Sequence, residues 1–249
     1  MESEKPENGP HVLKHFGKRL VALTEIGTGA TVLDLGMGRG SSLFPALKKV
    51  GNHGQIIGID ISDEMVRKTA TDIRGYNIKS VSLIQTDAKI LVFEDETFDV
   101  VLSGFSYIYS TLEEVLRVLR EGGQFGLTTW DTLEDMEWMA AFLRRYIDID
   151  SKKVYHQDTA EGLERLLRDA GFKEVKTVIE KEEFAYRSEG QWWEDMHDSG
   201  WRSHLEKIES MGPDKLEECK KEAFKGLQAH KDADGIHFTV SVLFAFGTK

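Results

Sequence analysis

Apolar and polar positions in the first half of the chain alternate between short apolar runs and amphipathic stretches. The apolar runs predict five strands, at 30–35, 55–59, 81–84, 98–102 and 124–129. Between them, helical spacing of apolar residues predicts helices over 41–50, over 62–75, and from Leu112 through Leu119 to a stop at Gly122. Strands that alternate with helices form right-handed crossovers in a parallel sheet covered on both faces. We therefore expect a doubly wound α/β fold.

The second half of the chain begins with one more helix and strand. Asp158 or Thr159 can begin a helix that ends at Gly171, and a strand is predicted at 173–179. The last predicted strand is 237–246, at the end of the chain.

The segment between these two strands has mainly helical periodicity. Pro213 begins one predicted helix, whose apolar face consists of Leu216, Cys219, Ala223 and Leu227. The prediction is a core domain formed by residues 1–180 and 236–249, with a helical lid inserted at 181–235.

Length and charge narrow the class of partner. The 249 residues fit one large domain or a domain with a sizeable insertion. The 43 acidic residues outnumber the 32 Lys and Arg residues, which gives a formal net charge of −11. This field disfavours nucleic acid and anionic membrane surfaces as partners, and it is compatible with a small-molecule ligand.

The cysteine content and the hydropathy bear on the cellular compartment. The single cysteine, Cys219, excludes an internal disulfide and a cysteine zinc cluster, and it fits a reducing compartment. Residues 1–10 lack the apolar core of a signal peptide, and no uncharged stretch reaches the ~18 residues that a membrane span needs. We expect a cytoplasmic protein with no membrane span.

The most informative motif is a glycine-rich turn between the first strand and the first helix. It has the spacing D-x-G-x-G-x-G, formed by Asp34, Gly36, Gly38 and Gly40. The dinucleotide fingerprint would need glycine where Ser41 stands, and the turn lacks the lysine of a phosphate-binding loop. A carboxylate at the mouth of such a turn suits a cationic ligand better than a pyrophosphate. These features disfavour NAD.

This turn resembles the first motif of the class I S-adenosylmethionine-dependent methyltransferases, and the resemblance continues along the predicted sheet. Residues 98–104 resemble the fourth strand of that family, and 117–123 resemble its helix-end signature, with Glu121 where proline is commoner. The resemblance implies a Rossmann-like sheet whose last strand is antiparallel, and S-adenosylmethionine as the cofactor.

The resemblance also implies roles for individual residues. Asp60, 24 residues after Gly36, would accept hydrogen bonds from both ribose hydroxyls. Asp87 would accept from the adenine amine, and the Ala88 backbone N–H would donate to the adenine ring. The cofactor site predicted in this way consists of Asp34, Gly36, Gly38, Gly40, Asp60, Ile61, Met65, Asp87, Ala88 and Ser103.

The identity of the methyl acceptor is constrained by residues 103–106. They read Ser-Gly-Phe-Ser, not the N/D-P-P-Y/F motif of enzymes that methylate DNA bases or protein glutamine. The chain resembles instead the small-molecule methyltransferases of ubiquinone and menaquinone biosynthesis, and residues 189–202 resemble a segment of their natural-product relatives. The expected acceptor is a small molecule, methylated at carbon, nitrogen or oxygen by in-line displacement.

Aromatic residues are dense where a lid would close over the acceptor, and a tryptophan of an inserted helix more often anchors that helix than lines a pocket. The N-terminal arm, 1–18, is a candidate second wall. The candidate pocket residues are Tyr107, Trp130, Trp192 and His197, with further aromatic residues at Tyr109, Trp138, Trp193 and Trp201.

Methyl transfer from a sulfonium needs little acid–base assistance, so the sequence singles out no catalytic residue. Histidines are candidate bases by residue type alone, and no spacing suggests a metal site. Two other classes stay open: an NAD(P)-dependent oxidoreductase of related fold, and a non-catalytic protein that binds S-adenosylmethionine. The oligomeric state is left undetermined. The histidines considered are His156, His197, His204 and His237.

Overall fold

The computed structural model describes residues 11–106, 110–131, 137–148, 159–198 and 201–249. The chain divides into two compact units. Unit 1 comprises residues 1–12, 132–157 and 181–241, and unit 2 comprises residues 13–131, 158–180 and 242–249. The sequence analysis placed the boundaries of the insertion at 181 and 235, whereas unit 1 also includes 132–157.

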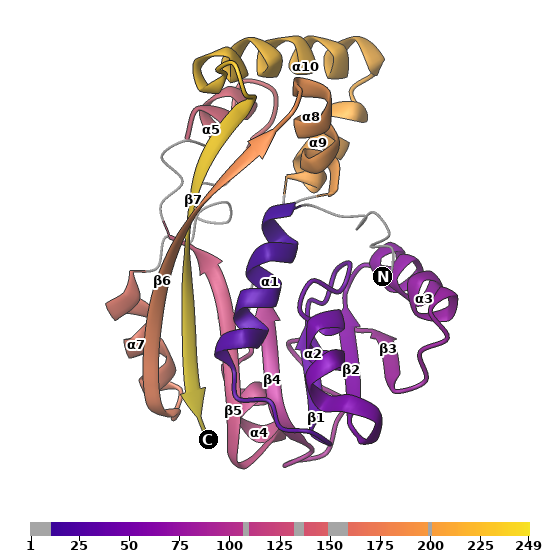
Figure 1. The fold of residues 1–249 in the computed structure, drawn as a ribbon, viewed down its shortest axis with the longest axis vertical. Coiled ribbons are helices and arrows are strands. Elements are labelled where there is room, and N and C mark those ends of the chain that lie inside the picture. Colours follow the sequence, from indigo (N-terminus) through magenta and orange to yellow (C-terminus); the bar gives the residue numbers. More distant parts are fainter. Residues whose placement is uncertain (1–10, 107–109, 132–136, 149–158, 199–200) are drawn as a thin grey trace. The chain divides into compact units, whose positions relative to one another are not determined.

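Unit 2 is built on a mixed sheet of seven strands in the order β3-β2-β1-β4-β5-β7-β6 (Figure 1). The first four neighbouring pairs are parallel, and β7 runs antiparallel to β5. The predicted α/β fold with an antiparallel last strand is therefore confirmed. The strands are β1 (Thr31–Leu35), β2 (Gln55–Asp60), β3 (Val81–Gln85), β4 (Phe98–Gly104), β5 (Leu119–Trp130), β6 (Lys173–Tyr186) and β7 (Ile236–Thr248).

Helices cover both faces of this sheet, and their ends follow from local sequence. The Ser62 side chain accepts a hydrogen bond from the Met65 N–H and caps α3, and Thr159 caps α7 in the same way through the Gly162 N–H. The helices of unit 2 are α1 (His11–Leu23), which begins in unit 1, α2 (Leu43–Val50), α3 (Asp63–Gly75), α4 (Leu112–Val118) and α7 (Ala160–Asp169), with a short 3₁₀ turn η1 (Gly51–His53).

The main core of unit 2 lies between the sheet and the helices α4 and α7. Val115 of α4 and Leu167 of α7 are fully buried there, and Phe125 of β5 stacks on Phe172 with 5.4 Å between ring centroids. The other face is covered near β5 by α1, because a Cβ added to Gly126 would lie 3.3 Å from Leu20. These two layers hold the carboxyl ends of the parallel strands at one edge of unit 2.

The boundary between α4 and β5 corrects the sequence prediction. The helix ends at Val118, and β5 begins at Leu119 instead of 124. Leu119 continues the helical spacing, but its backbone pairs with Phe98 and its side chain is fully buried as a strand residue. Gly122, with φ of 75°, lies in the irregular part of β5, just before the point at which β5 pairs regularly with β4.

Other elements differ from the prediction in extent. Helix α1 was not predicted at all, although Phe16, Leu20 and Val21 are buried on one side of it. Strands β6 and β7 extend beyond 179 and 246, to Tyr186 and Thr248. Helix α2 begins at Leu43 with Ser42 as its N-cap residue, two positions later than predicted.

Unit 1 is mostly helical and has an aromatic core. Trp192 is fully buried, and Trp138 stacks against it with 6.0 Å between ring centroids. A Cβ on Gly226 would lie 2.7 Å from the Trp138 ring, so α10 needs glycine at this contact. Its elements are α5 (Glu137–Leu143), α8 (Glu189–Asp198), α9 (Arg202–Glu209), α10 (Pro213–Leu227) and η3 (Gln228–His230), with the ends of β6 and β7.

Helix α10 confirms its predicted start at Pro213 and buries Cys219, Ala223 and Leu227, whereas Leu216 is only half-buried. Burial raises the pKa of the Cys219 thiol to about 12, which leaves this cysteine protonated and unreactive. Over the residues described above, no helix combines the length and apolar character needed to cross a membrane.

Candidate functional site

The glycine-rich turn after β1 is shaped by three residues in the left-handed region, Gly36, Gly38 and Gly40, with φ of 64°, 49° and 79°. A Cβ at Gly36 would collide with the Ser106 side chain, and one at Gly40 would lie 2.7 Å from the Phe44 ring. A Cβ at Gly38 would meet nothing within 4 Å. The outer two glycines are therefore required by packing within the chain, and the middle one borders open space.

The turn is fixed to its neighbours by hydrogen bonds along the chain. The Met37 N–H donates to the Ile59 carbonyl over 3.0 Å, which ties the turn to β2. The Thr69 hydroxyl of α3 donates to the Gly38 carbonyl over 2.8 Å. The turn is therefore held in place from β2 and from α3, and a ligand would meet an already formed surface.

Asp60, at the carboxyl end of β2, is the charged residue in contact with this turn. Its Oδ2 accepts the Gly38 N–H over 2.9 Å, and its Oδ1 accepts the Ser62 N–H over 2.8 Å. Each carboxylate oxygen can accept a second hydrogen bond. Asp60 can therefore shape the turn and still receive two hydroxyl donors from a ligand.

Asp34, near the carboxyl end of β1, is only 1% exposed. Its Oδ2 has no hydrogen-bond partner among the residues that the structure describes. Burial and the nearby charge of Asp60 raise its pKa to about 8, against the opposing effect of a hydrogen bond from the Leu43 backbone. An unpartnered buried carboxyl group of this kind is suited to a cationic ligand.

The remaining predicted cofactor residues on this side of the sheet follow β2 and β3, and among them Asp87 and Ala88 are the pair predicted to contact adenine. Ile61, directly after Asp60, leaves 70% of its surface exposed, which is unusual for a large apolar side chain. Asp87 is exposed, and its Oδ1 accepts the Lys89 N–H over 3.0 Å, which shapes the loop around Ala88. Met65 is half-buried in the first turn of α3. The strand order makes β2 and β3 neighbours, so these residues share one edge.

Residues at the ends of β4 and β5 also lie at this edge of the sheet, and the sequence predicted Ser103 but not Thr128 or Phe105. Ser103, a predicted residue, is 1% exposed, and its hydroxyl has no partner within the described chain. The Thr128 hydroxyl is likewise buried and unpartnered. Phe105 has φ of 56°, rare for an aromatic residue, and its N–H donates to the Thr128 carbonyl over 2.9 Å. Its ring lies 4.2 Å from that of Trp130, centroid to centroid.

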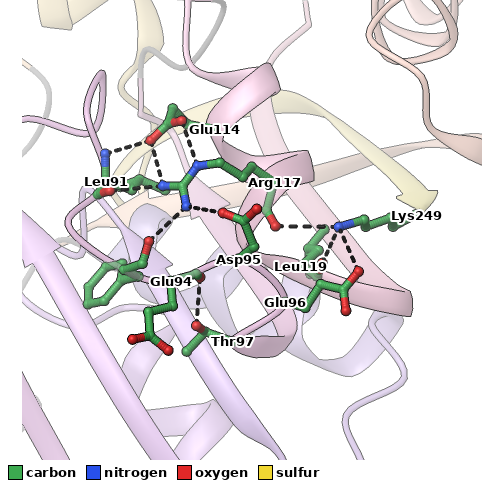
Figure 2. Close-up of polar contacts among 10 residues, drawn as sticks. Leu91, Glu94, Asp95, Glu96, Thr97, Glu114, Arg117, Leu119 and Lys249 are labelled. Atoms are coloured by element: carbon green, nitrogen blue, oxygen red, sulfur yellow. Dashed lines mark hydrogen bonds and ion pairs between the residues drawn. The ribbon is translucent and has the colours of Figure 1, made fainter.

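The segment that follows β3 is anchored by Arg117 of α4 (Figure 2). Its guanidinium donates to Glu114, to Asp95 and to the carbonyls of Leu91 and Phe93, at 2.7–2.9 Å. The Leu91 N–H donates back to Glu114 over 2.9 Å. The guanidinium lowers the pKa of Glu114 to about 2. The sequence motif contained Arg117, but only the structure shows that it fixes the chain between β3 and β4.

The other candidate residues belong to unit 1 or lie outside the described residues. Trp192 is in the aromatic core of unit 1, and its indole Nε1 has no described hydrogen-bond partner. His197 is half-buried, with its ring centroid 5.4 Å from that of Trp193. His237 pairs with Glu183 over 2.9 Å, which raises its pKa. Tyr107, Tyr109 and His156 fall outside the described residues.

Among the residues placed by the structure, no group of three or more His, Cys, Asp or Glu side chains could hold a metal ion.

Comparison with known proteins assigns the chain to a family. A family model described as a methyltransferase domain matches residues 26–184. The chain is 30% identical to the nocamycin O-methyltransferase of Saccharothrix syringae over 96% of its own length and 92% of that protein. The chain therefore belongs to the methyltransferase domain family, whose methyl donor is S-adenosylmethionine. The prediction of such an enzyme, of the small-molecule type, is confirmed, and an NAD(P)-dependent oxidoreductase is not favoured.

Other relatives share part of the chain. The aklanonic acid methyltransferase DauC of Streptomyces is 36% identical over 46% of this chain, a match that spans only 54% of that relative. The UbiE C-methyltransferase of Blochmanniella floridana is 36% identical over 63% of this chain and 71% of its own. Among solved structures, the YcgJ protein from Bacillus shares the fold with a TM-score of 0.62 and 18% identity, covering 94% of this chain and 98% of that one.

Proposed function

We propose that this enzyme binds S-adenosylmethionine at the carboxyl ends of β1, β2 and β3 and transfers its methyl group to a small-molecule acceptor. The observation that carries the proposal is the buried, unpartnered Oδ2 of Asp34 beside a turn whose middle glycine, Gly38, borders open space. A cation with donors fits this acceptor-rich edge, whereas a pyrophosphate would be repelled by Asp34 and Asp60.

Each part of the site has a role in this proposal. Asp60 accepts the two ribose hydroxyls with the oxygen lone pairs that the Gly38 and Ser62 N–H groups leave free. Exposed Ile61 and half-buried Met65 provide the apolar surface for the adenine ring. Asp87 and the Ala88 N–H bind its polar edge, and Ser103 contributes a hydroxyl from β4.

The bound cofactor supplies an electrophilic methyl group on a positively charged sulfur. The chain would contribute binding and orientation: the preformed turn would hold the donor, and exclusion of water would favour transfer to an acceptor held close to it. This step needs no histidine base, so we assign no general base.

Acceptor specificity is assigned to unit 1 in this proposal. Unit 1 contains the aromatic rings of Trp138, Trp192 and Trp193, and apolar rings with a few polar groups are typical of small-ligand sites. Two relatives are named as methyltransferases of aklanonic acid and of nocamycin. We therefore propose a small organic acceptor. A cytoplasmic location and the exclusion of nucleic acid stay predictions, supported by the single cysteine and the charge of −11.

The test is a screen of small-molecule extracts with the purified protein and S-adenosylmethionine labelled in its methyl group. We expect label to enter a small molecule with wild-type protein, and not with Gly38→Val, which fills the open space at the turn. Label that enters only protein or nucleic acid would contradict the proposed acceptor class.

A further inference from the structure

The two edge strands of the seven-stranded sheet differ in how they are protected against pairing with a further strand. These edge strands are β3 and β6, at opposite ends of the strand order (Figure 1). Seven of the 14 residues of β6 are charged, whereas β3 has no charged residue and no proline. Charged side chains and proline are common means by which a sheet edge resists association. The β3 edge lacks both.

The strand β3 is also accessible along its length. None of its five residues is buried: Ser82 and Gln85 are exposed, and the other three are half-buried. Within the described part of the chain, β3 pairs in parallel with β2, in unbroken register from Val81 to Gln85. A regular strand with one open side and apolar side chains at Val81, Leu83 and Ile84 is a template for a further strand.

The hydrogen bonds between β2 and β3 decide which backbone groups of β3 face outward. The Ile56 N–H donates to the Ser80 carbonyl over 2.9 Å, and the Thr86 N–H donates to the Asp60 carbonyl over 3.1 Å. Backbone groups of successive residues point to alternate sides of a strand, so the even-numbered residues of β3 pair with β2. The N–H and carbonyl groups of its odd-numbered residues therefore point away from β2, toward the open side.

The charges beside β3 are arranged symmetrically about its middle residue, Leu83. Lys79 lies four residues before Leu83, Asp87 lies four residues after it, and both are exposed. If two copies of β3 run antiparallel with their Leu83 residues opposite each other, Lys79 of each copy faces Asp87 of the other. A parallel pairing in register would place like charges side by side, which is unfavourable. The sequence around β3 is therefore complementary to itself in the antiparallel orientation.

We propose that two copies of this chain associate through their β3 edges, antiparallel, around a twofold axis at Leu83. The outward backbone groups of Leu83 then bond to those of Leu83 in the second copy, and Val81 pairs with Gln85 on either side. Each of these residue pairs exchanges two backbone hydrogen bonds. The charged residues of β6 protect the other edge of each sheet, so the association closes at a dimer.

This dimer is independent of the proposed function, because it follows from the sheet edge and its charges. Asp87 also belongs to the proposed donor site, so one such site lies beside each end of the paired strands. A single pair of strands of this length buries a limited area, and interfaces below about 1,200 Å² are typical of weak association. The dimer therefore forms reversibly, and its fraction rises with protein concentration.

Sedimentation velocity of the full chain tests the proposal, at concentrations from about 1 to about 200 µM and at low ionic strength, where exposed charges are least screened. We expect wild type to change from monomer to dimer within this range. Wild type that sediments as a monomer throughout would overturn the inference and leave the proposed function standing. Donor calorimetry on the same protein tests that function separately.

A first pair of variants tests the backbone pairing. Val81→Pro removes an outward N–H and no hydrogen bond to β2, and proline is tolerated at the first residue of an edge strand. We expect the dissociation constant of the dimer to rise by at least about thirtyfold, whereas Val81→Ala, which keeps the N–H, changes it by less than about threefold. Circular dichroism checks that both variants are folded. Equal dissociation constants for the two folded variants would contradict the pairing.

A second series tests the register and decides the matter alone if Val81→Pro does not fold. Lys79→Glu and Asp87→Lys each bring like charges together at both ends of the paired strands, so each should weaken the dimer by about tenfold. The double variant should restore the dissociation constant to within about threefold of wild type. Lys173→Glu, on β6, makes the same change of net charge and should have less than about a twofold effect. A dimer that Lys79→Glu and Lys173→Glu weaken equally would overturn the proposed interface.

Discussion

The two units of the chain differ in the polar groups that they leave unpartnered inside. In unit 2 these are oxygens at the ends of strands: Asp34 Oδ2 on β1, Ser103 Oγ on β4 and Thr128 Oγ1 on β5. In unit 1 they include the indole N–H groups of Trp138 and Trp192, set among aromatic rings. The unpartnered oxygens of unit 2 therefore lie where the donor is proposed to bind, whereas the buried indoles of unit 1 belong to its aromatic core.

We assign donor binding to unit 2 and acceptor choice to unit 1. Removing most of unit 1 tests this assignment. A variant in which a short Gly/Ser linker replaces residues 188–234 removes most of unit 1. A Cβ on Gly235 would lie 2.6 Å from the Tyr186 carbonyl, so the cut ends are adjacent and a short linker can join them. We expect methyl transfer to the identified acceptor to disappear, while donor affinity stays within about tenfold, or 1.4 kcal/mol.

Circular dichroism and donor calorimetry on the shortened protein check that unit 2 is still folded. If this protein binds the donor and still methylates the acceptor, unit 1 does not set acceptor choice, and the comparison between the units fails.

The glycine-rich turn provides the next largest effect. Gly38→Val places a branched side chain in the open space of the turn, and we expect donor affinity to fall by about a hundredfold or more. Gly29→Val is the matched control, since Gly29 also has positive φ, 85°, and nothing within 4 Å of an added Cβ. Both variants carry backbone strain, but only Gly38 borders the proposed site. Equal affinities of the two variants, measured by calorimetry, would refute the assignment.

Asp60 provides a smaller effect in the same unit. Asp60→Ala removes the acceptor for two ligand hydroxyls and for the Gly38 N–H, so donor binding should weaken by about 1.5–3 kcal/mol. Asp63→Ala, three residues later on α3 in an exposed ion pair with Arg67, should change the affinity by less than about twofold. A loss below threefold for Asp60→Ala would mean that this residue only shapes the turn.

The smallest predicted effect concerns stability rather than binding. Arg117→Met removes the contacts shown in Figure 2, and we expect the free energy of unfolding to fall by about 2 kcal/mol. Arg67→Met, in an exposed pair, should cost less than about 0.5 kcal/mol. Urea denaturation of the two variants measures the difference, and equal values would show that the Arg117 network is not stabilising.

The pH dependence of this variant has a defined sign. The pKa of Glu114 is lowered to about 2, so its stabilising contribution is present above its unfolded value of about 4.5 and is lost as the pH falls toward 2. Wild type should therefore lose more stability than Arg117→Met on acidification from pH 6 to pH 3. A parallel loss in both would contradict the role given to the pair of Glu114 and Arg117.

The sequence predicted most of unit 2 because its motifs depend on backbone geometry. A strand, a turn with glycines at 36, 38 and 40, and a helix can be recognised from spacing alone, and the structure has positive φ at all three. The parallel arrangement of β1 to β5 follows from the alternation of strands and helices. By contrast, Leu119 fits both a helix face and a strand, and only its pairing with Phe98 decides between them.

Other features of the site left no signal in the sequence. Phe105 has a left-handed backbone conformation that its residue type does not favour. Tertiary contacts hold it there, among them the hydrogen bond from its N–H to the Thr128 carbonyl. The unpartnered state of Asp34 Oδ2 depends on what surrounds it in three dimensions. In unit 1, the tryptophans could be counted from the sequence, but which of them stack could not, because such contacts join residues as distant as Trp138 and Trp192.

The central claim, that the turn after β1 is a site for a cationic methyl donor, is tested most directly by calorimetric titration of the wild-type protein with S-adenosylmethionine and, separately, with NADH. The account predicts saturable binding of one S-adenosylmethionine per chain, retained in Gly29→Val and lost in Gly38→Val, and no binding of NADH. Binding of NADH in place of S-adenosylmethionine, or donor binding that survives Gly38→Val unchanged, would contradict it.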